Sequence, residues 1–62
     1  MNTERTEQQK LHPIGSTLWY VGENGVTWSY VTGYQGTHFL VSRRRSNTVP
    51  PGNVVEQEMR AR

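Results

Sequence analysis

Three consecutive arginines, Arg43, Arg44 and Arg45, carry the most specific chemistry in this sequence. A guanidinium group forms paired hydrogen bonds to phosphate or carboxylate oxygens, which the ammonium group of lysine does not. Neighbouring side chains at the end of a strand point apart, so these arginines suit phosphates spaced along a nucleic-acid backbone better than one small anion. The alternative interpretation is a charged surface loop in which Glu56 or Glu58 pairs with one arginine.

Contacts to phosphates position a nucleic acid without reading its sequence, and nearby residues extend the candidate site. Asn47 adds amide donors shortly after the arginines. Tyr34 belongs to the face that alternation assigns to the core, but it sits at a turn, where its ring can be exposed near the arginines or at an interface. We therefore predict a binding site for DNA or RNA formed by Arg43, Arg44, Arg45, Asn47 and Tyr34.

Catalytic and metal chemistry have little support in the sequence. The chain contains no Cys, which excludes disulfides and thiolate zinc sites. It also contains no Asp, and His12 and His38 are its only imidazoles, so we expect no metal site. The serines show no evident triad arrangement with a histidine and a carboxylate, and no glycine-rich phosphate loop is present. We predict a binding protein that is not an enzyme and has no cofactor.

The length of 62 residues allows one domain with a small core. Folds of this size usually need disulfides, a metal or a partner subunit for stability. Of these, only a partner subunit remains possible here, so we expect a homo-oligomer or a protein partner. The longest apolar run, Leu18 to Val21, is far shorter than the ~20 residues that span a membrane. The polar N-terminus has no secretory signal, and we expect a cytoplasmic protein without membrane contact.

Aromatic and β-branched residues punctuated by glycines predict short strands between tight turns. We expect strands at residues 16–22, 26–34, 37–43 and 53–59, with residues 44–52 as a proline-containing loop. Asn24-Gly25 predicts the first hairpin, in either of two registers, and Gln35-Gly36 predicts the second. These strands divide the chain into a flexible tail at residues 1–13, a β domain at 14–59 and a short tail at 60–62.

Alternation along the strands predicts which side chains form the core. Uninterrupted alternation through both hairpins places most of the aromatic rings on one face, and we predict that this face is the core. The alternative makes the rings a platform on which bases stack, and it leaves a core that looks too small. The predicted core residues are Trp19, Val21, Val26, Trp28, Tyr30, Tyr34, Phe39 and Val41.

The opposite face carries an apolar stripe that crosses the first three predicted strands. A chain this short has little left to cover that stripe, so we predict that it contacts another protein molecule. The predicted interface residues are Leu18, Tyr20, Val31, His38 and Leu40.

A bent antiparallel meander with a final strand after a loop resembles the SH3-like small barrels, including Tudor-type modules. The resemblance covers residues 15–59 and rests on the two glycine turns and the ending VPPGNVVEQEM. It implies an all-β, SH3-like antiparallel barrel of four to five short strands. WSYVTGY, FLVS and VVEQEM are also similar to strands of plasmid-type dihydrofolate reductase, but the V-Q-I-Y pore segment of that enzyme is absent.

Together these patterns predict a nucleic-acid-associated accessory or regulatory protein that contacts phosphates through its arginines. The alternative is a protein-interaction or structural adaptor module that docks its partner on the apolar stripe.

Overall fold

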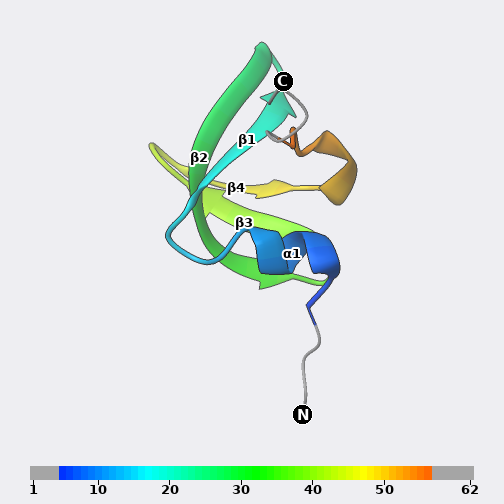
Figure 1. The fold of residues 1–62 in the computed structure, drawn as a ribbon. Helices are drawn as coiled ribbons and strands as arrows, with labels where there is room; N and C mark the ends of the chain where they lie inside the picture. The colour runs from blue at the N-terminus through cyan, green and yellow to red at the C-terminus, as the bar shows by residue number, and fades with distance from the viewer. Residues whose placement is uncertain (1–4, 57–62) are drawn as a thin grey trace.

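The computed structural model describes residues 5–56, which form four strands and two short helical segments. The strands make one antiparallel sheet in the order β1-β2-β3-β4, which curves without closing into a barrel (Figure 1). The predicted all-β class is therefore confirmed. No helix in the described residues is long and apolar enough to cross a membrane. In chain order the elements are α1 (Glu7–Leu11), β1 (Thr17–Gly22), β2 (Gly25–Gln35), β3 (His38–Ser42), β4 (Ser46–Val49) and the 3-10 turn η1 (Pro51–Asn53).

The first three strands lie within a residue of their predicted positions. Both hairpins also turn where the glycines predicted, and Gly25 (φ +110°) and Gly36 (φ +62°) adopt backbone angles that other residues rarely take. In the first hairpin Trp19 lies opposite Trp28, which is the second of the two predicted registers.

A β-bulge in β2 reverses the predicted sidedness of the sheet. Val31 pairs with Val41 and Gly33 pairs with Leu40, so Thr32 is an extra residue on the β2 side. One extra residue moves every earlier side chain of β2 to the opposite face relative to β3. The side chains of β1 change face as well, because β2 is the only strand beside β1 in the order β1-β2-β3-β4.

The core therefore differs from the predicted one in its first two strands. Trp19, Val21, Val26 and Tyr30 are exposed, whereas Leu18 and Val31 of the predicted interface have 0% and 1% of their surface exposed. The prediction was wrong because it assumed uninterrupted alternation from β1 to β3. The prediction remains correct for Phe39 and Val41, which lie on β3, the strand that carries no extra residue. The buried apolar residues are Leu18, Tyr20, Val31, Phe39, Val41 and Val49, with Tyr34 and Val54 packed against them.

The fourth strand also differs from the prediction, because β4 lies in the segment expected to be a loop. Ser42 pairs with Ser46, so the chain turns back through residues 43–45 alone. Only Val49 of β4 is buried, which explains why its sequence shows no alternation. The predicted strand at 53–59 is represented by an isolated bridge between Val54 and Tyr20 of β1, and its residues 57–59 lie outside the described part.

A short helix forms in the segment for which we expected no ordered structure. Thr6 and Gln9 make a capping box, in which the Thr6 hydroxyl accepts from the Gln9 amide and the Gln9 side chain accepts from the Thr6 amide. The helix ends at Leu11, just before His12-Pro13, because a proline disfavours helical backbone angles in the residue that precedes it.

The reversed sidedness predicts how two aliphatic truncations differ. Leu18→Ala should lower the free energy of unfolding by about 2–5 kcal/mol, because it leaves a cavity in the core. Val26→Ala should change it by no more than about 0.5 kcal/mol, because Val26 is 58% exposed. Urea unfolding followed by circular dichroism measures both, and a larger loss for Val26→Ala than for Leu18→Ala would contradict the observed sidedness.

Candidate nucleic-acid interface

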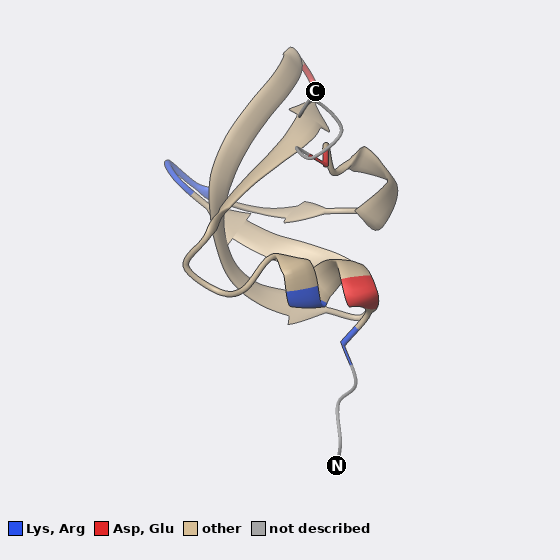
Figure 2. Ribbon diagram, in the orientation of Figure 1, with Lys and Arg blue, Asp and Glu red and all other residues tan. Residues whose placement is uncertain are grey.

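The three arginines form the entire connection between β3 and β4, which we call the arginine turn (residues 43–45). All three are exposed, and the turn projects from one end of the sheet (Figure 2). Arg44 and Arg45 have no ion-pair partner among residues 5–56. Of the carboxylates proposed as partners, Glu56 pairs with His12 instead, and Glu58 lies outside the described residues. Within the described chain, these two guanidinium groups are thus available to an external anion.

Arg43 folds back onto β2 and links the arginine turn to the aromatic residues. Its Nε donates to the Trp28 carbonyl oxygen at 3.0 Å, and its guanidinium carbon lies 4.2 Å from the centre of the Trp28 ring. β2 extends past the end of β3, since Ser42 pairs with Tyr30, and the carbonyl of Trp28 lies beyond that ladder. Arg43 supplies a donor to this part of the strand edge and stacks on the indole, an attractive cation–π arrangement.

The surface of β1 and β2 that faces away from the core carries three aromatic rings, with Trp28 between the other two. Trp19 and Trp28 lie opposite each other with ring centres 6.4 Å apart, and Tyr30 meets Trp28 edge-on at 5.2 Å. Trp19 is 37% exposed and Tyr30 is 46% exposed. We call this surface the outer face; it comprises Trp19, Val21, Val26, Trp28 and Tyr30.

The remaining residues of the predicted binding site fall at two different places. Asn47 lies on β4 close to the arginine turn, and its side-chain oxygen accepts from the Thr48 amide at 2.8 Å. Tyr34 lies at the opposite end of β3, where it pairs with Phe39. Its hydroxyl donates to the His12 carbonyl at 2.8 Å, and Arg5 lies 4.8 Å from the centre of its ring. The structure therefore groups Asn47 with the arginines and separates Tyr34 from them.

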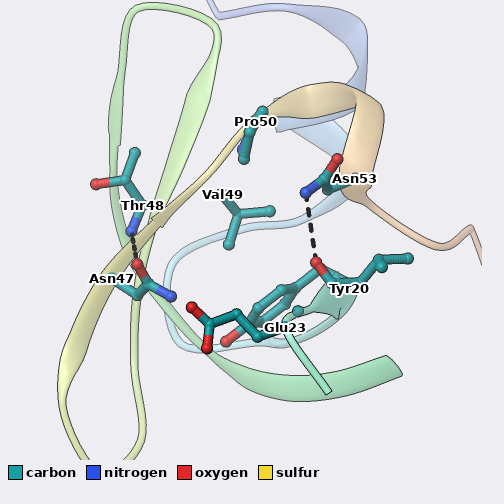
Figure 3. A pocket seen from close by; sticks show the side chains of 9 residues that line it. Tyr20, Glu23, Asn47, Thr48, Val49, Pro50 and Asn53 are labelled. Atoms are coloured by element: carbon teal, nitrogen blue, oxygen red, sulfur yellow. Dashed lines mark hydrogen bonds between the residues drawn. The ribbon is translucent and has the colours of Figure 1, made fainter. Parts of the chain in front are cut away.

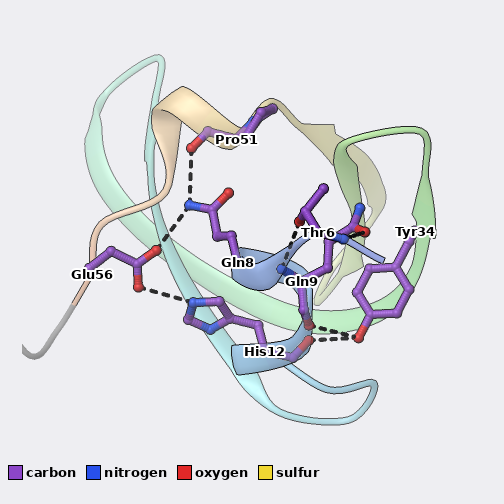
Figure 4. Close-up of polar contacts among 7 residues, drawn as sticks. All are labelled: Thr6, Gln8, Gln9, His12, Tyr34, Pro51 and Glu56. Carbon is purple, nitrogen blue, oxygen red and sulfur yellow. Dashed lines mark hydrogen bonds and ion pairs between the residues drawn. The ribbon is translucent and has the colours of Figure 1, made fainter. Parts of the chain in front are cut away.

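Tyr34 belongs to a polar network by which α1 closes its end of the sheet (Figure 4). Gln9 is 1% exposed, and its amide nitrogen donates to the carbonyls of Gly36 and His38. His12 packs edge-on against Phe39, with ring centres 5.7 Å apart. This end of the core is covered by the chain itself, so an external ligand has no access to it.

Glu56 ties the segment after η1 to the helix. Its two carboxylate oxygens contact Gln8 Nε2 at 2.9 Å and His12 Nε2 at 3.1 Å. The hydrogen bond from Gln8 is the main cause that lowers the pKa of Glu56; the contact with His12 acts in the same direction, and partial burial opposes both. The carboxylate thus stabilises the closed end in its ionised form.

The predicted interface residues do not form one exposed surface. Leu18, Tyr20 and Val31 are buried in the core, Leu40 is half-buried, and the backbone of His38 accepts from Gln9. The first three have almost no surface to offer a partner. Among the described residues no group of three or more histidines and carboxylates is placed to hold a metal ion.

Two features of the structure were not predicted, although local sequence patterns indicate both. The Thr6-x-x-Gln9 pattern is the signature of a capping box and predicts α1. Gly33, next to the extra residue Thr32, is a signal for a bulge, because isolated glycines inside strands often accompany one. Recognising that bulge would have placed the tryptophans outside.

Comparisons of the chain with protein-family models, with curated proteins and with solved structures find no match.

The lowered pKa of Glu56 predicts a specific acid sensitivity. A carboxylate whose pKa is lower in the folded state adds stability above its unfolded pKa, near the ordinary value of 4.5, and this contribution is lost as the pH falls through the folded pKa. Glu56→Gln should therefore flatten the dependence of unfolding free energy on pH below about pH 5. Urea titrations at several pH values measure this slope, with Glu7→Gln on the exposed side of α1 as the matched control. Equal slopes in wild type and Glu56→Gln would show that the carboxylate does not stabilise the closed end.

Proposed function

We propose that this protein binds single-stranded nucleic acid, with bases stacked on the outer face and phosphates held by the arginine turn. The observation that carries the proposal is the direct contact between the two groups, because Arg43 stacks on the half-buried Trp28, which lies between the exposed rings of Trp19 and Tyr30. Proteins that bind single strands combine aromatic rings for the bases with a positive path for the backbone.

The exposed rings favour a single strand over a duplex. A ring can stack on a base only when that base is not already stacked between its neighbours in a helix, and every base has a face that suits a tryptophan. The arginines contact phosphates of any sequence, so this combination supports little sequence preference.

The architecture is compatible with the SH3-like resemblance. After the meander, η1 leads to Val54, which bridges Tyr20 of β1, and the Val55 amide donates to the Trp19 carbonyl at 2.8 Å. This return to the first strand has the outline of the final strand of an SH3-like barrel. We infer that the protein is an open variant of that fold, acting as a binding module.

The arginine turn predicts a salt-dependent affinity. The double variant Arg44→Ala/Arg45→Ala should weaken binding to single-stranded oligonucleotides of every sequence. Each arginine that no longer meets a phosphate should also reduce the slope of log affinity against log salt by about 0.7. Fluorescence anisotropy with a labelled oligo(dT) and an RNA of mixed sequence measures both quantities.

The matched control for the arginine turn is Arg5→Ala/Lys10→Ala, which removes the same charge beside α1. If the control and the arginine-turn variant lose affinity equally, the effect reflects net charge and the turn is no binding site.

The outer face predicts a loss of stacking when one ring is removed. Trp19→Ala should weaken oligonucleotide binding by about 1–3 kcal/mol, roughly 5- to 150-fold, whereas Trp19→Phe should retain much of the affinity because it keeps a ring. Val26→Ala on the same face is the control without a ring. Quenching of tryptophan fluorescence by the oligonucleotide gives a direct readout, and unchanged affinity in Trp19→Ala would remove the outer face from the site.

A second candidate function uses the apolar part of the same face. Val21 is 46% exposed and Val26 is 58% exposed, and these two paired residues continue the aromatic cluster toward the hairpin tip. Exposed apolar groups of this kind also suit a protein partner or a second copy of the chain. Light scattering coupled to size exclusion, with and without the oligonucleotide, distinguishes a monomer that binds nucleic acid from a protein assembly.

A further inference from the structure

The end of the sheet opposite α1 is open, and it forms a polar cleft that we call the mouth. The mouth lies between the β1–β2 hairpin and the arginine turn and has a volume of about 650 Å³. It is lined by residues of the β1–β2 hairpin, including Tyr20 and Ser29, and by the three arginines of the connection between β3 and β4 together with Asn47 of β4. The core-facing residues of β1 and β2 become polar here, whereas nearer α1 they are Leu18 and Val31.

Two nearly buried hydroxyl groups lie at the base of the mouth. The Tyr20 and Ser29 oxygens are 2.8 Å apart, and the two residues are only 7% and 6% exposed. A pair of hydroxyls has two protons, and their mutual hydrogen bond uses only one. Within residues 5–56 neither hydroxyl has another hydrogen-bond partner, so one buried O–H donor remains for a ligand in the mouth.

The charges around the mouth favour an anion. Among residues 5–56, Arg43, Arg44 and Arg45 line it together with one carboxylate, that of Glu23 at the tip of the first hairpin. Figure 3 shows Tyr20, Glu23 and Asn47 among the residues that line the adjoining pocket between β1 and β4. Glu23 is exposed and weakens the positive potential without cancelling it, since its single negative charge is outnumbered by the three arginines that line the mouth.

We propose that the mouth is a phosphate site in which the hydroxyl pair donates one hydrogen bond and Arg44 and Arg45 neutralise the charge. The arrangement supplies one buried neutral donor at the base and cations at the rim, and a phosphate group accepts from both. Because Arg43 belongs to both the mouth and the outer face, a strand can place a phosphate in the mouth while its bases lie on the rings. This extension rests on the proposed function for the identity of the strand, but phosphate binding itself can be tested separately.

The first test titrates inorganic phosphate and pyrophosphate into the labelled protein and follows backbone amide signals by NMR. The expected result is a saturable shift centred on Ser29 and Asn47 that is lost in Tyr20→Phe/Ser29→Ala, because that variant removes both hydroxyls. Sulfate at the same ionic strength separates specific binding from screening. Shifts that are confined to the arginine turn, or unchanged in the double variant, would overturn the proposal, as would the absence of any saturable shift in the wild type.

The matched control is Tyr34→Phe/Ser16→Ala, which removes the same two kinds of hydroxyl outside both proposed binding surfaces. The Tyr34 hydroxyl donates to the His12 carbonyl at the closed end, and the Ser16 hydroxyl donates to the Pro13 carbonyl. The control should bind phosphate as the wild type does. Glu23→Gln is a variant that leaves the core intact and whose expected effect on affinity is the opposite one. It should tighten phosphate binding, and unchanged or weaker binding would count against the mouth as a phosphate site.

A second test separates this proposal from the proposed function. Oligonucleotides with and without a 5′-phosphate are compared for the wild type and Tyr20→Phe/Ser29→Ala. A preference for the phosphorylated strand that the variant loses identifies the ligand as a terminal phosphate, and an equal loss for both strands identifies an internal phosphodiester. If the wild type binds pyrophosphate in the mouth but no oligonucleotide, the mouth stands and the nucleic-acid function fails. If oligonucleotide binding survives unchanged in the variant, the outer face stands and the mouth fails.

Discussion

The bulge at Thr32 governs how this sheet is assembled. One additional residue in β2 sets the half of the sheet formed by β1 and the start of β2 out of phase with β3. Aliphatic residues thereby join Phe39 and Val41 inside, and the two tryptophans turn outward. The Thr32 hydroxyl donates to the Leu40 carbonyl at 3.1 Å, so the extra residue is tied to the neighbouring strand. A bulge also bends a strand, and β2 curves along its length in Figure 1.

The size of the enclosed space gives a physical reason why the aliphatic residues face inward and the tryptophans face outward. A short curved sheet has a small concave side and a larger convex one, and interiors are packed without room to spare. Leu18 and Val31 fit the concave side, whereas two indole rings need the surface of the convex side. The cost of this solution is that a large aromatic area meets water, which is unusual unless a ligand uses it.

The two ends of the curved sheet have opposite characters. α1 closes one end with Gln9, whose buried amide satisfies two carbonyl groups and also completes the helix cap. The other end is open, and the residues that face inward there are hydroxyls and guanidinium groups. The closed end stabilises a fold that lacks disulfides, which leaves the open end and the outer face available for binding. The contacts that close the fold are thus separated along the strands from the two surfaces proposed for binding, and Arg43 joins those surfaces through its contact with Trp28.

Local composition and turn chemistry were enough to predict the all-β class, three of the four strands, both glycine hairpins and the concentration of positive charge at residues 43–45. The sidedness, the fourth strand and the position of Tyr34 emerge only in the folded chain. Alternation along a strand identifies two faces but does not say which one is buried, and a single bulge exchanges them without changing composition. β4 has only Val49 in the core, so its pairing with β3 is visible only once the arginine turn brings the two strands together. Tyr34 lies away from the arginines because it pairs with Phe39 near the start of β3, whereas the arginines follow the end of that strand.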